Sequence, residues 1–348
     1  MIALAGTTLV TGRLEECKSI LQTFAKYEHH GLLPNLFPEG DVEPMYNSVD
    51  APLLFINAVY EYIQTSKDNA FLQEVWDVLK RIMTAYEKGT DYHIGMDSDC
   101  LIQAGADLEQ LTWMDVRVGE YLPTPRHGKP VEINAYWYND LEIMKQFALL
   151  QQDNELAQHY AELADKVKEA FLLKFWNEEE NCLKDVLSGN SEENQVRCNQ
   201  VWVLSMPYTM LPKEKELCVL HKIKEELYTT AGLRTLSPKD SAFHDIYIGS
   251  MQERDRAYHQ GTVWAFPLGA YYRAWIKYLR QDASDNTSAY KAELAEGIEA
   301  IRYWLEEGCL GQLAEIYDGA NPTVSRGCFA QAWSVGELLR AVYEWEQL

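Results

Sequence analysis

The feature that most constrains the fold of this chain is its helical periodicity. Apolar residues recur at spacings of three and four in RLEECKSILQTFAKYE, residues 13–28, and the pattern returns along most of the chain. Strand-like alternation is scarce, and strands do not alternate with helices as a parallel sheet would require. Pro267 indicates a helix that is kinked or begins late. The pattern predicts helices over 2–10, 13–28, 50–64, 70–88, 133–151, 154–175, 196–206, 213–227, 261–279, 288–306 and 329–346.

The loops between these helices follow a regular rhythm. A short polar turn such as 65–69 follows one helix, and a long loop rich in Gly and Pro follows the next. Long loops without secondary structure usually carry function in a compact domain. Short turns at one end and long loops at the other are typical of a ring of helical hairpins with a site at one end. No linker divides the chain, so we expect one domain over 1–348. The long loops are 30–48, 89–131, 228–258 and 307–327.

Composition narrows the possible partners. Hydrophobic residues make up 47% of the chain, which is ample for a core, and the net charge is −22 at pH 7. Such an acidic chain is a poor partner for nucleic acid or an anionic membrane, whereas a neutral sugar is compatible with it. The apolar residues 1–10 are too few to span a bilayer and lack the basic start of a signal peptide.

Cysteine usage and missing motifs exclude further classes. The seven cysteines are scattered and form no CxxC pair, which favours reduced thiols in a cytoplasmic protein without a metal or other cofactor. The sequence contains no GxGxxG, GxxxxGK[ST], GxSxG or HExxH. Nucleotide binding, serine hydrolysis and zinc proteolysis therefore have no support.

Two carboxylates set among aromatic residues indicate an enzyme that cuts glycosidic bonds. Asp115 follows Trp113 in LTWMD, and Glu315 stands in AEIYDG. Such chemistry needs one acid to protonate the leaving oxygen and one base to activate water. Apolar neighbours can raise the pKa of Asp115 and keep its proton available. The alternative is a core ion pair with Arg117 or Arg126.

Several polar residues at predicted helix starts have two interpretations. Ser48 is a plausible N-cap, so Asp50 is expected in the first helical turn, where it either complements the helix dipole or binds sugar. Glu132 has the same dipole explanation. His259 and Gln260 just precede a predicted helix and could bond sugar hydroxyls, with capping or a buried polar role as the alternative.

Taken together, six segments in order resemble the glucosidase domain of glycogen-debranching enzymes, the amylo-α-1,6-glucosidase family. They cover nearly the whole chain: GLLPNLFPEG…YNSVDAPLLF, LTWMDVRVG, TPRHGKPVEINAYWYN, GLRTLSP, YIGSMQERDRAYHQGTVWAFPLGAY and AEIYDGANPTVSRGCFAQAWSVGELLR. The resemblance implies an all-α (α/α)6 toroid that hydrolyses α-1,6 branch stubs of glycogen limit dextrin with inversion. It implies that Asp115 is the general acid and Glu315 the general base, about 6.5–9.5 Å apart. It places around the glucose Asp50, Trp113, Arg126, Lys129, Glu132, Arg234, Asp255, His259, Gln260 and Trp333.

The chain also departs from the family pattern. Family members carry a Gly-Arg-Asp-Thr run just before the segment that here begins MIAL, and they carry a further β-rich or transferase domain. We therefore expect the C-terminal part of a longer architecture, with the first helix possibly incomplete. Two alternatives stay open. One is another toroid glycosidase, glucoamylase-like or trehalase-like, which a panel of linkages would reveal. The other is a glucan-binding fragment with impaired catalysis.

Overall fold

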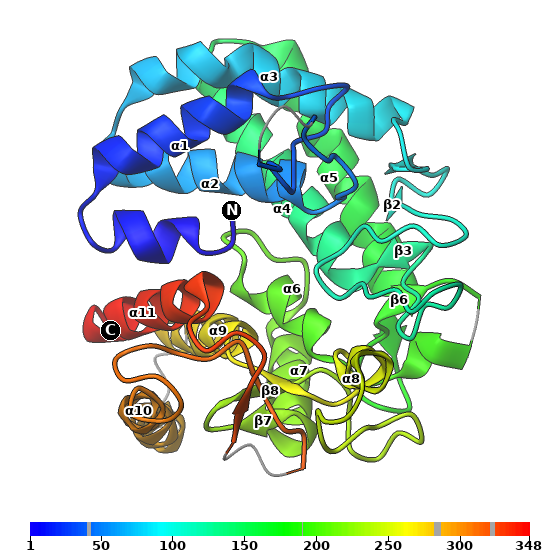
Figure 1. Ribbon diagram of the computed structural model, residues 1–348. Coiled ribbons are helices and arrows are strands. Elements are labelled where there is room, and N and C mark those ends of the chain that lie inside the picture. Colours follow the sequence, from blue (N-terminus) through cyan, green and yellow to red (C-terminus); the bar gives the residue numbers. More distant parts are fainter. Residues whose placement is uncertain (40–42, 190, 282–286, 321–323) are drawn as a thin grey trace.

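The computed structural model describes residues 1–39, 43–189, 191–281, 287–320 and 324–348, and these are mostly helical (Figure 1). A π-helical turn, η1, spans Ala5–Leu9, and short 3₁₀ turns span Ser191–Asn194 (η2) and Cys198–Gln200 (η3). The α-helices are α1 Leu14–Lys26, α2 Ala51–Ser66, α3 Asn69–Lys88, α4 Val131–Leu150, α5 Asn154–Lys174, α6 Val201–Ser205, α7 Lys213–Glu226, α8 Met251–Ala257, α9 Phe266–Gln281, α10 Thr287–Trp304 and α11 Ala332–Glu346.

The periodicity predicted the long helices correctly and their ends less well. In place of the helices predicted over 2–10 and 196–206, the structure has the shorter elements η1 and η3–α6. The helix predicted from 261 begins only at Phe266, with Pro267 in its first turn. Proline is favoured there because its missing N–H would have no helical partner anyway. α2 begins at Ala51, so its N-cap is Asp50 and not Ser48 as expected.

The molecule is not purely α-helical, which corrects the all-α expectation. Five short strands form one antiparallel sheet in the order β11-β10-β9-β8-β7. Strands of two or three residues are too short to show alternation in the sequence. The sheet strands are β7 Tyr228–Thr229, β8 Gly232–Arg234, β9 Val263–Trp264, β10 Ile316–Tyr317 and β11 Ser325–Arg326. The other strands are β1 Gly95–Met96, β2 Ile102–Gln103, β3 Lys129–Pro130, β4 Trp176–Asn177, β5 Cys182–Leu183 and β6 Val186–Leu187.

The core lies between helices that pack along their lengths. α4 packs against α2, α5 and α6, and α9 packs against α6 and α11. Most of α4 is buried, including its aromatic residues, as expected of a helix covered on all sides. None of the helices described is long and apolar enough to cross a membrane.

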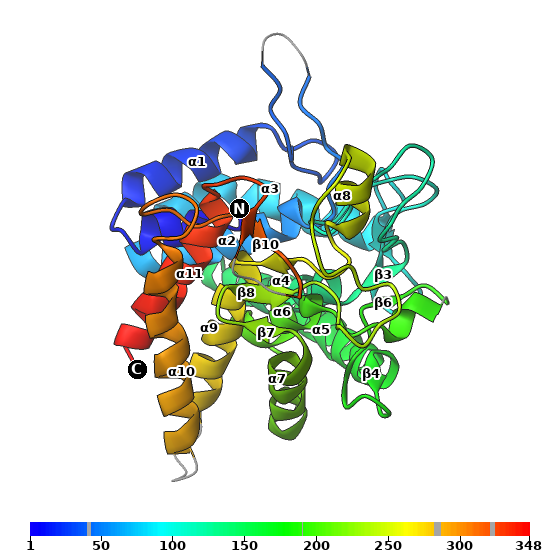
Figure 2. The same cartoon turned by 60° about the horizontal axis from the view of Figure 1, so that its bottom comes forward.

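The long loops gather at one end of the molecule. In Figure 2 the projecting segment after α1, the loops around β2 and β3, and α8 lie toward one end, whereas α7 and α10 extend toward the other. This arrangement matches the rhythm of loop lengths in the sequence. It brings segments that are far apart in the chain to a common face.

Candidate active site

A cavity of about 530 Å³ opens among these loops. Its walls come from residues 1–3, the foot of the segment after α1, the loop 110–115 and the start of α11. The volume lies in the range of about 300–1,000 Å³ that is usual for small-molecule sites. Four of the predicted site residues line it together: Asp50, Trp113, Asp115 and Trp333.

Asp115 is held in this wall by its own loop. Its Oδ2 accepts hydrogen bonds from the backbone N–H of Leu111 and, at 2.7 Å, of Thr112; its Oδ1 accepts one from the Thr112 hydroxyl at 3.1 Å. Burial raises the pKa of the Asp115 carboxyl, although these hydrogen bonds and the charge of Arg126 oppose the rise. Asp115 can therefore keep its proton at a higher pH than an exposed aspartate can.

The rival interpretation of Asp115 as half of an ion pair finds no support in the described part of the chain. Arg117 pairs with Glu120, and Arg126 pairs with Glu132 and Asp185. Arg126 reaches the acid only indirectly, because one of its amino groups lies 3.4 Å from the Thr112 hydroxyl.

Glu315 is positioned by two other loops. It directly precedes β10; its Oε1 accepts a hydrogen bond from the Tyr258 hydroxyl at 2.5 Å, and its Oε2 accepts one from the Cys328 N–H at 2.9 Å. Gly327 has a φ of +64°, and a Cβ there would lie 2.4 Å from Glu315 Oε2, so any other residue would strain the backbone and displace the Glu315 carboxylate. Glu315 does not line the cavity, but the loop that binds it leads directly to the cavity residues Gln331 and Trp333.

A cluster of aromatic rings connects the two carboxylates. The ring of Trp264 lies 5.3 Å from that of Trp113, 4.9 Å from that of Tyr258 and 5.5 Å from that of Trp333, between centroids. Trp113 belongs to the loop of Asp115, and Tyr258 bonds Glu315. The cluster therefore links the loop of Asp115 to the tyrosine that bonds Glu315, and two of its rings, Trp113 and Trp333, line the cavity.

His259 belongs to the same cluster, and Gln260 supports it. His259 is buried and stacks on Trp264 with ring centroids 5.0 Å apart, and neither ring nitrogen has a partner among the described residues. Burial, aided by the charges of Arg197 and Arg126, lowers the pKa of His259 well below its ordinary value, so the imidazole is neutral. The Gln260 amide donates to the Pro123 carbonyl at 2.6 Å and accepts from Arg197 at 2.7 Å, so it connects two loops.

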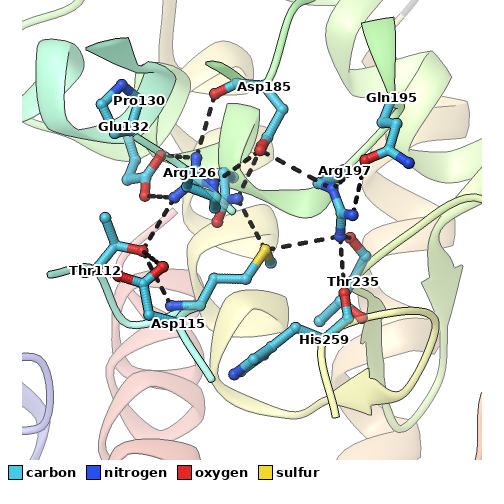
Figure 3. A network of polar contacts seen from close by, with 12 residues as sticks. Thr112, Asp115, Arg126, Pro130, Glu132, Asp185, Gln195, Arg197, Thr235 and His259 are labelled. Carbon is cyan, nitrogen blue, oxygen red and sulfur yellow. Dashed lines mark hydrogen bonds and ion pairs between the residues drawn. The ribbon is translucent and has the colours of Figure 1, made fainter. Parts of the chain in front are cut away.

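Arg126 and Glu132 form a buried ionic network behind the loop of Asp115 (Figure 3). Arg126 donates to both oxygens of Glu132, one at 2.6 Å, and to Asp185 at 2.8 Å. Asp185 in turn accepts from Asn199 at 2.8 Å, and Asn199 accepts from the Trp113 indole at 2.8 Å. The network is buried, and Arg126 and Glu132, which were both predicted to bind the sugar, form hydrogen bonds with protein groups.

Three further predicted residues also lie outside the cavity lining. Lys129 pairs with Asp97 and Asp99, each at 2.7 Å, and Arg234 donates to the Gly319 carbonyl at 2.8 Å. Asp255 is half-buried on α8. Their roles toward sugar stay predictions.

Sequence reasoning missed several residues that shape the site. Tyr258 lies within a segment that resembles the family but has no predicted role there, and no sequence pattern marks Asp185, Arg197 or Asn199. Their contacts join residues that are 14 to 86 positions apart in the sequence, and a local sequence pattern does not predict such contacts.

Two yeast glycosidases are similar in sequence to this chain. The chain is 25% identical to the glycogen debranching enzyme of Saccharomyces cerevisiae, over 99% of this chain and 29% of that protein. It is 26% identical to the mannosyl-oligosaccharide glucosidase of the same yeast, over 47% of this chain and 21% of that protein. The chain thus spans less than a third of the length of these relatives.

Solved structures share the fold at low sequence identity. A sialidase superposes with a TM-score of 0.64 and 14% identity over 90% of this chain and 28% of that one. A rhamnosidase from Klebsiella oxytoca with rhamnose bound has a TM-score of 0.62 and 15% identity over 97% of this chain and 56% of that one. The sequence profile of the amylo-alpha-1,6-glucosidase family matches residues 1–340, and the chain therefore belongs to that family.

Proposed function

We propose that this chain is an inverting glycoside hydrolase that releases glucose from the α-1,6-linked branch stubs of a glycogen limit dextrin. The observation that carries the proposal is Asp115, a partly buried carboxyl with a raised pKa in the wall of an aromatic-lined cavity. Family membership and the similarity to a glycogen debranching enzyme support the α-glucan substrate. Under this proposal the helices close a six-hairpin toroid, and the chain is one cytoplasmic domain that needs no metal or other cofactor.

The proposed reaction uses the two carboxyl groups once each. Asp115 gives its proton to the glycosidic oxygen as the bond from that oxygen to the anomeric carbon breaks. Glu315, as carboxylate, takes a proton from a water molecule whose oxygen bonds the anomeric carbon from the opposite face. The α-linkage therefore yields β-glucose and a shortened glucan, and proton transfer through solvent restores both groups.

The surrounding residues would hold the sugar for this step. Trp113 and Trp333 offer ring surfaces at the cavity. The ring centroid of His259 lies 5.4 Å from that of Trp113, and neither nitrogen of this neutral imidazole has a partner among the described residues. Asp50 lines the same cavity and can accept hydroxyl hydrogen bonds. Burial raises the pKa of Asp50, which suits a group that either donates or accepts.

Two variants test the assignment of acid and base. With limit dextrin as substrate, Asp115→Asn and Glu315→Gln should each lower kcat by about 10²–10⁴-fold. With α-glucosyl fluoride, whose leaving fluoride needs no proton, Asp115→Asn should keep most of its activity while Glu315→Gln loses it. The exposed Asp165→Asn on α5 is the matched control.

The outcomes separate the proposal from its rivals. Near-normal hydrolysis of limit dextrin by Asp115→Asn would refute the role of the acid. If the unaltered chain cuts α-1,4 or α,α-1,1 linkages best, it is a glucoamylase-like or trehalase-like enzyme. Glucan binding without turnover on any linkage would make it a binding fragment.

A further inference from the structure

A projecting segment forms one wall of the cavity, and we call its described residues 34–39 and 43–47 the arm. Its two sides pair where the N–H of Asn35 bonds the Met45 carbonyl at 2.9 Å and the N–H of Met45 bonds the Leu36 carbonyl at 3.0 Å. Pro34, Asn35 and Asn47 line the cavity. Figure 2 shows the arm standing out from the body of the molecule, at the same end as α8.

The arm presents apolar side chains to solvent beside the cavity. Leu36 is 50% exposed, Phe37 42% and Met45 47%. Single exposed apolar residues are ordinary on a protein surface, but a group of them next to a site indicates contact with a ligand or partner.

The ring of Phe37 is held in place by two neighbours. Its centroid lies 5.5 Å from that of Phe24 and 5.0 Å from that of Tyr27, in edge-to-face arrangements of 80° and 81°. Phe24 itself lines the cavity. An aromatic ring that is both fixed and exposed is a ready surface for the apolar face of a sugar.

The foot of the arm touches the loop that carries the proposed acid. The Asn47 amide donates to the Gln110 carbonyl at 3.1 Å, and Gln110 directly precedes Leu111, whose N–H bonds Asp115. The other amide atom, Asn47 Oδ1, is buried without a partner among the described residues. Asn47, which lines the cavity, therefore carries an acceptor that no described residue uses.

We propose that the arm binds the leaving-group side of the substrate, the glucosyl units of the α-glucan that remain after glucose is released. This inference rests on the proposed function. The acid protonates the oxygen that departs with the leaving chain, so that chain starts next to Asp115 and must extend outward along the wall nearest to it. The arm is that wall, with Asn47 bonding a hydroxyl near the acid and Phe37 stacking on a unit farther out.

Two substrates of different length test the proposal. Phe37→Ala should raise KM for a phosphorylase limit dextrin by about two- to tenfold, the effect of losing one aromatic contact, with kcat unchanged. The kinetics of Phe37→Ala on isomaltose, whose leaving group is a single glucose, should not change. Phe37→Trp should restore the low KM for dextrin. Tyr303→Ala on α10, which removes a ring that is 67% exposed elsewhere, is the matched control.

Dextrin affinity of the same variants, measured by electrophoresis in dextrin-containing gels, keeps the two proposals separable. If the unaltered chain hydrolyses neither substrate, the proposed function fails, yet weaker dextrin binding by Phe37→Ala still supports the arm. Equal losses on isomaltose and dextrin, or unchanged dextrin kinetics and binding, would overturn the inference. The inference would also be overturned if the unaltered chain were a dimer and Phe37→Ala a monomer with unchanged dextrin kinetics and binding. The arm would then bind a second copy of the chain.

Discussion

At the scale of single residues, Tyr258 is the side chain that most directly controls the proposed base. Its hydroxyl lies 2.5 Å from Glu315 Oε1, and burial, together with that carboxylate, raises the pKa of the phenol, so Tyr258 stays a hydrogen-bond donor. A donor of this kind favours the ionised carboxylate and fixes its orientation.

Replacing Tyr258 by Phe removes that donor and leaves the ring in the aromatic cluster. We expect kcat on limit dextrin to fall by about 10–100-fold, the usual value of a hydrogen bond to a charged group. Steady-state kinetics gives kcat and KM separately, and a change in KM alone would contradict a role through Glu315.

The residues of the site were predicted unevenly. Asp50, Trp113, Asp115 and Trp333 meet at one cavity, and their prediction came from local residue patterns and motif resemblance and not from periodicity. Spacing along a chain reports which face of a helix is apolar, but it does not report that Asp185 approaches Arg126 from a distant loop. Such pairs form only when the tertiary fold brings distant segments together.

At the scale of elements, the long helices were predictable and α8 was not. Helices of four or more turns carry an apolar stripe, which is a local property of the sequence. α8 spans only Met251–Ala257 and has one buried residue, Ala257, so it shows no stripe. Its local signal is the capping box of Ser250 and Glu253, which apolar periodicity does not detect.

The buried helix α4 carries a group that should make stability depend on pH. Asp140 is fully buried; Asn139 donates to its Oδ1 at 3.3 Å, and its Oδ2 has no partner among the described residues. Burial raises the pKa of Asp140 well above its ordinary value of 3.8, so the folded chain keeps this proton while the unfolded chain loses it. The stability from this group is therefore complete below about pH 4 and is lost as the pH rises toward the folded pKa.

Asp140→Asn should remove that part of the pH dependence. Relative to the unaltered chain, its free energy of unfolding should rise with pH, by up to about 1.4 kcal/mol per unit above about pH 4. Urea unfolding at several pH values measures this, with the exposed Asp165→Asn as a parallel control. A constant difference between the Asp140 variant and the unaltered chain would show that Asp140 is ionised when folded.

At the scale of the whole molecule, buried charge joins the loop of Asp115 to distant segments. Arg126 pairs with Glu132 at the start of α4 and with Asp185 beside β6, and all three side chains are at most 2% exposed. Removing one partner of such a set leaves uncompensated charge in the interior. The network thus ties the proposed acid to the helical core.

Arg126→Met should therefore destabilise the entire chain, by about 3–5 kcal/mol in the free energy of unfolding. Arg117→Met, which breaks the surface pair with Glu120, should cost less than about 1 kcal/mol. Thermal and urea unfolding compare the two variants. If Arg126→Met keeps its stability and loses only sugar affinity, Arg126 is a substrate ligand, as the family resemblance implies.

The central claim concerns the whole molecule as an enzyme, namely hydrolysis of an α-1,6 stub with inversion by Asp115 and Glu315. Proton NMR of the first glucose released from a phosphorylase limit dextrin tests it most directly, because the two anomers give separate signals before mutarotation mixes them. We expect β-glucose to appear first and α-glucose to follow only through mutarotation. Initial release of α-glucose would contradict the inverting mechanism, and the absence of any release would contradict the proposed activity of this chain.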